Sequence, residues 1–285
     1  MNPKTKCCGD DTMNIFEVMQ EYVDRNHYVD VADKVPVFLC SIGTHIFNGL
    51  NKCGYCPHQE GVGDSSFVIE SCILRHDKPS IYTPMSHVAD TRLHIVMRGQ
   101  KGSGKSVLIN LFLAPNTGLL SNPANADIGM GFRTDIGPNS ITEAGMFGSV
   151  DEDGEIVGRP LARELCGGFL GFEEFSSLTD AGRKEHSTDI TNQMLTSTDN
   201  GRVKKVMKNG WVEYLTRYTI WAGTQPARFE MESGMDRRFF VIDIDMNPGK
   251  ELEFKKAQAT QASMPVDERA DLAEMAFAMR DFFTH

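Results

Sequence analysis

From about residue 90 onward, short apolar runs alternate with longer stretches that suit helices. Leu93–Met97 is typical of a buried strand and Val107–Leu113 of a buried helix. Further strand-like runs occupy Gly168–Phe172, Thr219–Ala222 and Phe239–Asp243. Because strands that alternate with helices form α/β domains around a mostly parallel sheet, we predict such a core over residues 90–246.

The pattern before this core is less regular, and we treat residues 1–89 as an N-terminal extension. Asn14 is a candidate N-cap for a helix that runs to about Arg25, with an apolar face made by Ile15, Phe16, Val18, Met19 and Tyr22. Residues 1–12 look poorly structured. Residues 31–90 mix apolar runs with Gly, Pro, Cys and His, and they give strand signals only at 67–69 and 72–74.

A break at Asn247-Pro248-Gly249 ends the predicted core. Two helices are expected after it, one around Glu251–Ala262 and one from Val266 to Phe283, with Pro265 between them. Residues 247–285 are therefore expected to form a small C-terminal helical segment.

Composition narrows the class of protein. The chain has 285 residues, 40% of them hydrophobic, but no apolar run of membrane-spanning length and no secretory signal at its N-terminus. Seven cysteines, an odd number in a chain of this length, favour reduced thiols and a cytoplasmic location. The net charge of −10 excludes a uniformly basic nucleic-acid binder, although a local basic element on an acidic body remains compatible with it.

A complete G-x-x-x-x-G-K-[ST] pattern lies between the first strand and the first helix of the core. Its glycines let backbone N–H groups turn toward a phosphate, and the helix that follows presents its positive N-terminus to the anion. Lys105 is expected to reach the β- and γ-phosphates, and Ser106 to hold Mg²⁺. The predicted nucleotide-binding residues are Gly99, Gln100, Lys101, Gly102, Ser103, Gly104, Lys105 and Ser106.

Two carboxylates follow the apolar strand near residue 170. Glu173 is a candidate to support Mg²⁺, and Glu174 is a candidate general base that polarises the attacking water. Acidic residues also occur at strand ends for no catalytic reason. The presence of the phosphate loop upstream is what makes a catalytic role for this pair the favoured interpretation.

The strand that starts at Thr219 ends in polar residues. Gln225, or failing that Thr224, is a candidate to contact the γ-phosphate or to orient the water. The alternative is an ordinary strand-to-loop transition before Pro226.

Two adjacent arginines, Arg237 and Arg238, precede the last strand-like run. Arginine neutralises a transferring phosphoryl group through its planar, permanently charged fork, and in a ring it can reach into the neighbouring subunit's site. The alternative is surface solvation or a structural ion pair.

These residues together resemble the AAA+ ATPases, and within them the minichromosome maintenance (MCM) helicases, especially the shortened MCM-like proteins of archaeal plasmids and viruses. The resemblance covers roughly residues 90–245. Glu173-Glu174-Phe175 stands where MCM proteins have Asp-Glu-Phe, Ala222–Pro226 where they have Ala-Ala-Ala-Asn-Pro, and Arg238-Phe239 where they have Ser-Arg-Phe. The Glu-Glu pair and the Arg-Arg-Phe run also resemble viral superfamily-three replication helicases.

Two predicted hairpins favour the MCM resemblance. Asp153-Gly154 lies between short β-forming runs, where the family carries its helix-two insert. Asn209-Gly210 lies between alternating strands, where the family carries its pre-sensor hairpin. By that resemblance, four cations would grip DNA phosphates: Arg202, Lys204, Lys205 and Lys208. Alternatively, the lysines only keep an exposed hairpin soluble.

The resemblance implies an ATP-hydrolysing ring motor, expected to be a hexamer, that unwinds or translocates along DNA in the replication of a virus or mobile element. ATP and Mg²⁺ are the implied cofactors, and Arg269 or Arg280 is a candidate second sensor. A protein-remodelling AAA+ ATPase and a nucleotide-binding switch with negligible turnover are the alternatives.

A cysteine cluster lies in the N-terminal extension. Cys53 and Cys56 form a C-x-x-C pair with His58 close by, and Cys40, His45 and Cys72 are possible further zinc ligands. Because a second C-x-x-C is lacking, free cysteines buried as small apolar residues are the favoured interpretation.

Overall fold

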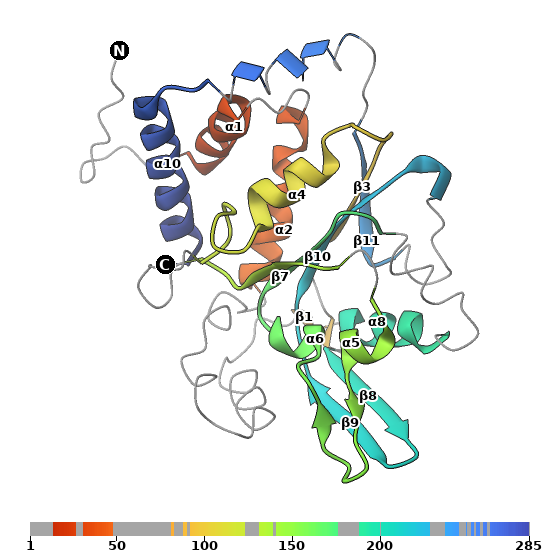
Figure 1. The fold of residues 1–285 in the computed structure, drawn as a ribbon. Helices are drawn as coiled ribbons and strands as arrows, with labels where there is room; N and C mark the ends of the chain where they lie inside the picture. Colours follow the sequence, from red (N-terminus) through yellow and green to blue (C-terminus); the bar gives the residue numbers. More distant parts are fainter. Residues whose placement is uncertain are drawn as a thin grey trace.

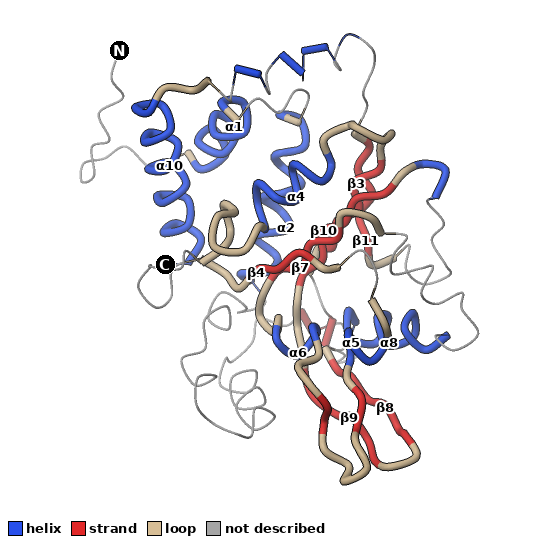
Figure 2. The backbone as a smooth tube through the Cα atoms, in the orientation of Figure 1, coloured by secondary structure: helices blue, strands red, loops and turns tan. Residues whose placement is uncertain are grey.

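A five-stranded parallel sheet organises the chain (Figure 2). The computed structural model describes residues 14–26, 31–47, 81–82, 88–89, 92–122, 131–138, 141–175, 188–199, 201–228, 237–244 and 263–284, with short helical pieces between 249 and 260. The strand order is β11-β3-β10-β7-β4. The strands are β3 (His94–Arg98), β4 (Thr134–Ile136), β7 (Phe169–Phe172), β10 (Thr219–Thr224) and β11 (Phe239–Asp243).

The inner strands β7 and β10 are buried on both faces, as their continuous apolar sequence predicts. All six residues of β10 and all four of β7 are buried. Every pairing in this sheet is parallel, so the strand ends that carry the polar residues gather at one edge. The predicted α/β class with a parallel sheet is therefore confirmed.

Four helices share a core with one face of the sheet (Figure 1). They are α1 (Ile15–Arg25), α2 (Val35–Phe47), α4 (Lys105–Leu113) and α10 (Val266–Thr284). The helices α2 and α4 lie next to the strands, and α1 and α10 lie outside them. Phe38 of α2 packs its ring 5.3 Å from that of Phe112 and 5.1 Å from that of Trp221, measured between centroids. Two helices of the N-terminal region thus share one core with the sheet.

The two terminal helices follow their sequence patterns closely. Asn14 caps α1 by accepting a hydrogen bond from the backbone N–H of Phe16, as predicted. Met19 and Tyr22 are buried as expected, but Phe16, which was predicted on the buried face, is 36% exposed. In α10 the buried positions recur at helical spacing, at Leu272, Ala276, Met279 and Phe283.

The other face is covered by α5 (Glu143–Phe147), α6 (Leu161–Glu164), α8 (Thr188–Asp199) and two antiparallel hairpins. The hairpins pair β5 (Ser149–Val150) with β6 (Ile156–Val157), and β8 (Arg202–Met207) with β9 (Gly210–Leu215). They lie side by side (Figures 1 and 2). The remaining elements are η1 (Ala32–Lys34), η4 (Pro226–Arg228), β1 (Ile81–Tyr82) and β2 (Val88–Ala89).

Both predicted hairpins are present, but the turn of the second is displaced by one residue. Met207 pairs with Gly210, so the two-residue turn is Lys208-Asn209 rather than Asn209-Gly210. Neither Asn209 nor Gly210 has a positive φ, so the turn is not the I′ type that Asn-Gly normally favours. Because Gly210 still pairs with Met207 of β8, it belongs to β9 and not to the turn.

The structure describes only some of the other segments for which the sequence gives an expectation. Residues 252–253, 255–256 and 259–260 are helical, in line with the helix expected there. The expectations for residues 1–12, 67–69 and 72–74 lie outside the described residues. Among the described helices, none combines the length and apolar character needed to cross a membrane.

We expect Phe38→Ala to lower the free energy of unfolding by ~3–5 kcal/mol, because it empties the contact between α2, α4 and the sheet. Urea denaturation measures the change. Phe277→Ala is the matched control, since that ring on α10 is 54% exposed and its loss should cost little. Equal losses in the two variants would contradict a core shared by α2 and the sheet.

Candidate nucleotide site

The predicted phosphate loop connects the end of β3 to the start of α4. Gly102 and Gly104 have positive φ values of 83° and 86°, which glycine adopts without strain. Gly99 donates its backbone N–H to Thr224 O at 3.0 Å and leaves no room for a side chain, since a Cβ there would lie 2.6 Å from Ile244 O. The loop is therefore fixed at its base to both strands that flank β3.

Lys105 is the first residue of α4, and its side chain turns back into the loop. Its Nζ donates to Gly99 O and Gln100 O, both at 2.8 Å, and to Ser103 Oγ at 3.2 Å. Burial lowers the pKa of this ammonium, and the nearby charge of Glu174 opposes that shift. An ammonium that is desolvated in this way gains much from an added anion, and a phosphate would supply one.

Glu173 is linked to the start of α4 through a residue that sequence reasoning missed. Asn110 donates from Nδ2 to Glu173 Oε1 at 2.9 Å and to Ser106 O at 2.8 Å. Asn110 follows Ser106 by four residues, so it lies one turn further along the same face of α4. A lone amide in an otherwise apolar helix was the signal that could have identified it.

Glu174 receives two hydrogen bonds from the end of β10. Thr224 Oγ1 donates to Glu174 Oε1 and Gln225 Nε2 donates to Glu174 Oε2, each at 3.3 Å. Both residues proposed for contact with the γ-phosphate or the water thus converge on the proposed general base. This convergence follows from the strand order, because β10 lies between β3 and β7.

Gly223 makes that convergence sterically possible, and it too was missed. A Cβ at this position would lie 2.7 Å from Glu173 O and 3.3 Å from Lys105 Cβ. Its carbonyl accepts from Phe175 N at 2.6 Å, so the chain after the two acids is tied to β10. Only glycine lets β10 pass this close to both groups of the site.

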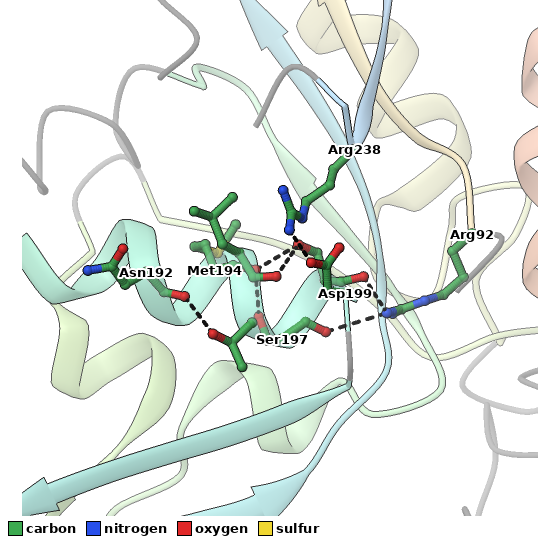
Figure 3. A network of polar contacts seen from close by, with 9 residues as sticks. Arg92, Asn192, Met194, Ser197, Asp199 and Arg238 are labelled. Atoms are coloured by element: carbon green, nitrogen blue, oxygen red, sulfur yellow. Dashed lines mark hydrogen bonds and ion pairs between the residues drawn. The ribbon is translucent and has the colours of Figure 1, made fainter. Parts of the chain in front are cut away.

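The two arginines lie beside the amino-terminal ends of the strands, opposite to the carboxyl ends that carry the candidate site. They precede the amino end of β11, about 13 Å of strand away from the edge where the phosphate loop begins. Arg237 is exposed. Arg238 forms an ion pair with Asp199, the last residue of α8, and its side chain is only 16% exposed (Figure 3). For Arg238 the structural ion pair, which was the alternative interpretation, is present.

Arg92, two residues before β3, joins the same contact region (Figure 3). It is buried and donates to Ser197 O at 3.4 Å, Thr198 O at 3.1 Å and Tyr218 O at 2.5 Å. Cations near the last carbonyls of a helix are favourable because the helix dipole is negative there. Arg92 and Arg238 therefore fix the C-terminal end of α8 to the sheet.

The four hairpin cations do not share one face. Lys205 turns inward and pairs with Glu143 of α5 at 2.8 Å. Arg202 and Lys204 lie on the outer face and both contact Glu213 of β9, whereas Lys208 is exposed in the turn. The expectation that all four reach one ligand conflicts with the alternation of side chains along β8.

The second-sensor candidates lie on α10. Arg280 donates from Nε to Leu119 O at 3.0 Å and from Nη2 to Gly118 O at 2.8 Å, which ties α10 to the segment beyond the C-terminal end of α4. Its contacts are thus at the end of α4 remote from Lys105. Arg269 is exposed near the start of α10.

The proposed zinc ligands are described only in part. Cys40 is exposed on α2, whereas His45 of the same helix is buried and bonds Thr219 Oγ1 at 2.8 Å. Cys53, Cys56, His58 and Cys72 lie outside the described residues. Within the described part of the chain, no three His, Cys, Asp or Glu side chains form a group that could hold a metal.

We expect Gly223→Ala to destabilise the protein by about 1–3 kcal/mol, because the added methyl displaces Glu173 or Lys105. Thermal or urea unfolding tests this. Gly43→Ala is the control: its Cβ would meet nothing within 4 Å in α2, and alanine should stabilise that helix by about 0.5–1 kcal/mol. If Gly223→Ala matched this control, the close approach of β10 would not constrain the site.

No protein-family model matches the chain, and a search of curated proteins finds no matching sequence. Assignment of a function to this site therefore depends on its own geometry and chemistry.

Proposed function

We propose that the chain is a magnesium-dependent ATPase of the AAA+ type that works as a ring-shaped motor on DNA, similar to MCM-like helicases. One observation carries the ATPase part. The phosphate-loop lysine, two carboxylates and two polar strand-end groups meet at the carboxyl edge of one parallel sheet. This edge is where α/β sheets bind their ligands.

The donor set suits a magnesium nucleotide. Ser106 offers a hydroxyl and Glu173 a carboxylate, and hard oxygen ligands of this kind are what Mg²⁺ prefers. Asn110 holds both elements at a fixed spacing through its two hydrogen bonds. Mg²⁺ would neutralise phosphate charge there, and the backbone N–H groups of residues 104–106 with Lys105 would hold the triphosphate.

Glu174 is suited to polarise water. It lies next to Lys105 closely enough to influence its pKa, and its two oxygens are oriented by Thr224 and Gln225. A carboxylate that is positioned by two donors beside the phosphate loop supports the proposed role of Glu174 as the base that polarises the attacking water. Gln225 Nε2 has a second N–H available for the water or the phosphate.

An arginine from a neighbouring subunit would complete the site. Arg237 and Arg238 lie at the edge remote from their own phosphate loop, so they would serve the adjacent protomer of a ring. Arg237 is the better candidate because it is exposed, whereas Arg238 is held by Asp199. This refines the expectation that Arg238 would lead.

The proposed action on DNA is supported by the resemblance in sequence and by the outer face of the β8–β9 hairpin. Arg202, Lys204 and Lys208 are exposed there, with Glu213 as the opposing carboxylate. A remodelling ATPase would share the hydrolytic residues but would not respond to DNA, so stimulation by DNA separates the two functions.

We expect Glu174→Gln to reduce ATP hydrolysis about 10²–10⁴-fold while ATP binding persists, because it removes the basic carboxylate but keeps the shape of the side chain and one of its two acceptor oxygens. Lys105→Ala should lose binding itself. Phosphate release and binding of a fluorescent ATP analogue measure the two effects. Glu17→Gln, a change on exposed α1, is the control. If Glu174→Gln turned over like the wild type, water activation by Glu174 would be wrong.

We expect the double variant Lys204→Ala/Lys208→Ala to keep basal ATPase activity and lose its stimulation by single-stranded DNA. Loss of two phosphate contacts should also lower the slope of log affinity against log salt by about 1.4. Lys255→Ala/Lys256→Ala, which removes two exposed cations elsewhere, is the charge-matched control. Stimulation that survives in the first variant would rule out this hairpin as the DNA contact.

A further inference from the structure

The outer face of the β8–β9 hairpin exposes a pair of large apolar side chains. Val206 and Trp211 are direct cross-strand partners next to the turn. They are 75% and 66% exposed, the former on β8 and the latter on β9. A tryptophan left in water on a projecting hairpin is typical of a binding residue rather than of a core residue.

The alternation of the hairpin prevents Trp211 from turning inward. Its neighbour Val212 is buried against the second core cluster, and Tyr214 donates its hydroxyl hydrogen to Phe147 O at 3.1 Å. These contacts fix the inner face of β9, so Trp211 must point to the opposite side. The exposed pair is thus a rigid feature of the hairpin.

The acidic β5–β6 turn lies against the inner side of this hairpin. A Cβ on Gly210 would meet the Gly154 Cα at 3.3 Å and the Val150 Cγ2 at 3.7 Å, and both of these residues belong to the β5–β6 hairpin. Val150 also packs against the second core cluster, as Val212 does. The β5–β6 turn, whose residues 151–155 include four acids, therefore lies on the inner side of the β8–β9 hairpin, opposite to Trp211.

Cations flank the apolar pair on its own side. Lys204 precedes Val206 by two residues on the same face, and Lys208 occupies the adjoining turn. Together with Arg202 they outnumber the one carboxylate of this face, Glu213. A flat π surface between positive charges fits an unpaired base and its flanking phosphates. The excess of positive charge around the pair favours a polyanionic ligand over a hydrophobic protein contact.

We propose that Trp211, backed by Val206, is a stacking platform for one base of single-stranded nucleic acid, with Lys204 and Lys208 on the neighbouring phosphates. This inference rests on the proposed action of the hairpin on DNA and adds to it a preference for unpaired strands. Bases in a duplex offer no free face to a side chain, so a platform of this kind selects single strands.

Intrinsic fluorescence provides a direct test. The chain has two tryptophans, and Trp221 is fully buried, so a change on binding reports Trp211. We expect a single-stranded thymidine oligonucleotide to quench the emission of the wild type. Heparin, a polyanion without bases, should bind without that quenching. In Trp211→Ala the quenching should disappear, and Trp221 should still report a folded core.

Affinity gives the second readout. Trp211→Ala should weaken binding of the oligonucleotide about 5- to 150-fold by fluorescence anisotropy, as expected for loss of one stacked base. Trp211→Phe should recover most of that loss because it keeps an aromatic face. Val157→Ala, which truncates an exposed valine on the neighbouring hairpin, is the matched control and should bind like the wild type.

The other outcomes are distinguishable. Unchanged binding of the oligonucleotide by Trp211→Ala would refute the stacking platform, and so would equal quenching of the wild type by heparin. In either case the proposed binding of DNA by the hairpin would be unaffected. If the wild type hydrolysed ATP but bound no oligonucleotide, the proposed action on DNA would fail as well. If Trp211→Ala changed only the sedimentation of the protein, the pair would contact a second copy of the chain, which also refutes the platform.

Discussion

Close approach of β10 to the end of β7 and the start of α4 is the constraint on which the candidate site depends. Glu173, just after β7, and Lys105 of α4 lie so close to β10 that Gly223 has no space for a methyl group. This contact brings the carbonyl of Glu173 against β10 and places Thr224 within reach of Glu174. The phosphate loop is tied to the same strand by the Gly99 N–H to Thr224 O bond. A small displacement of β10 would therefore disturb the lysine, both acids and the polar strand end together.

The amino-terminal ends of the strands hold α8 in place. There Arg92 and Arg238 hold the C-terminal end of α8, and β8 follows α8 directly (Figure 3). Residues 216–218 then lead from β9 into β10, the strand that ends at Thr224 and Gln225. One continuous strand thus connects the base of the hairpin to the groups around Glu174. If nucleotide hydrolysis moves the hairpin, β10 is the rigid element through which the two ends are linked.

Each hairpin face has its own chemistry because side chains alternate along a strand. The inner face is apolar and includes the Lys205–Glu143 pair, where both side chains are mostly buried. The outer face combines Trp211 and Val206 with the exposed cations Arg202 and Lys204. Strand alternation therefore turns Lys205 toward Glu143 and leaves its neighbour Lys204 exposed beside Glu213.

By itself the sequence determined the parallel α/β core, the phosphate loop, the helix capped by Asn14 and the existence of both hairpins, because these depend on local periodicity, turn chemistry and short motifs. It did not reveal α2, since that segment lacks a clear polar face, nor the roles of Asn110 and Gly223, whose partners are distant in sequence. It also grouped Arg202, Lys204, Lys205 and Lys208 as one basic element and treated Arg238 as available. Only the tertiary structure decided these points, because pairing with Glu143, Glu213 and Asp199 depends on which elements pack together in space.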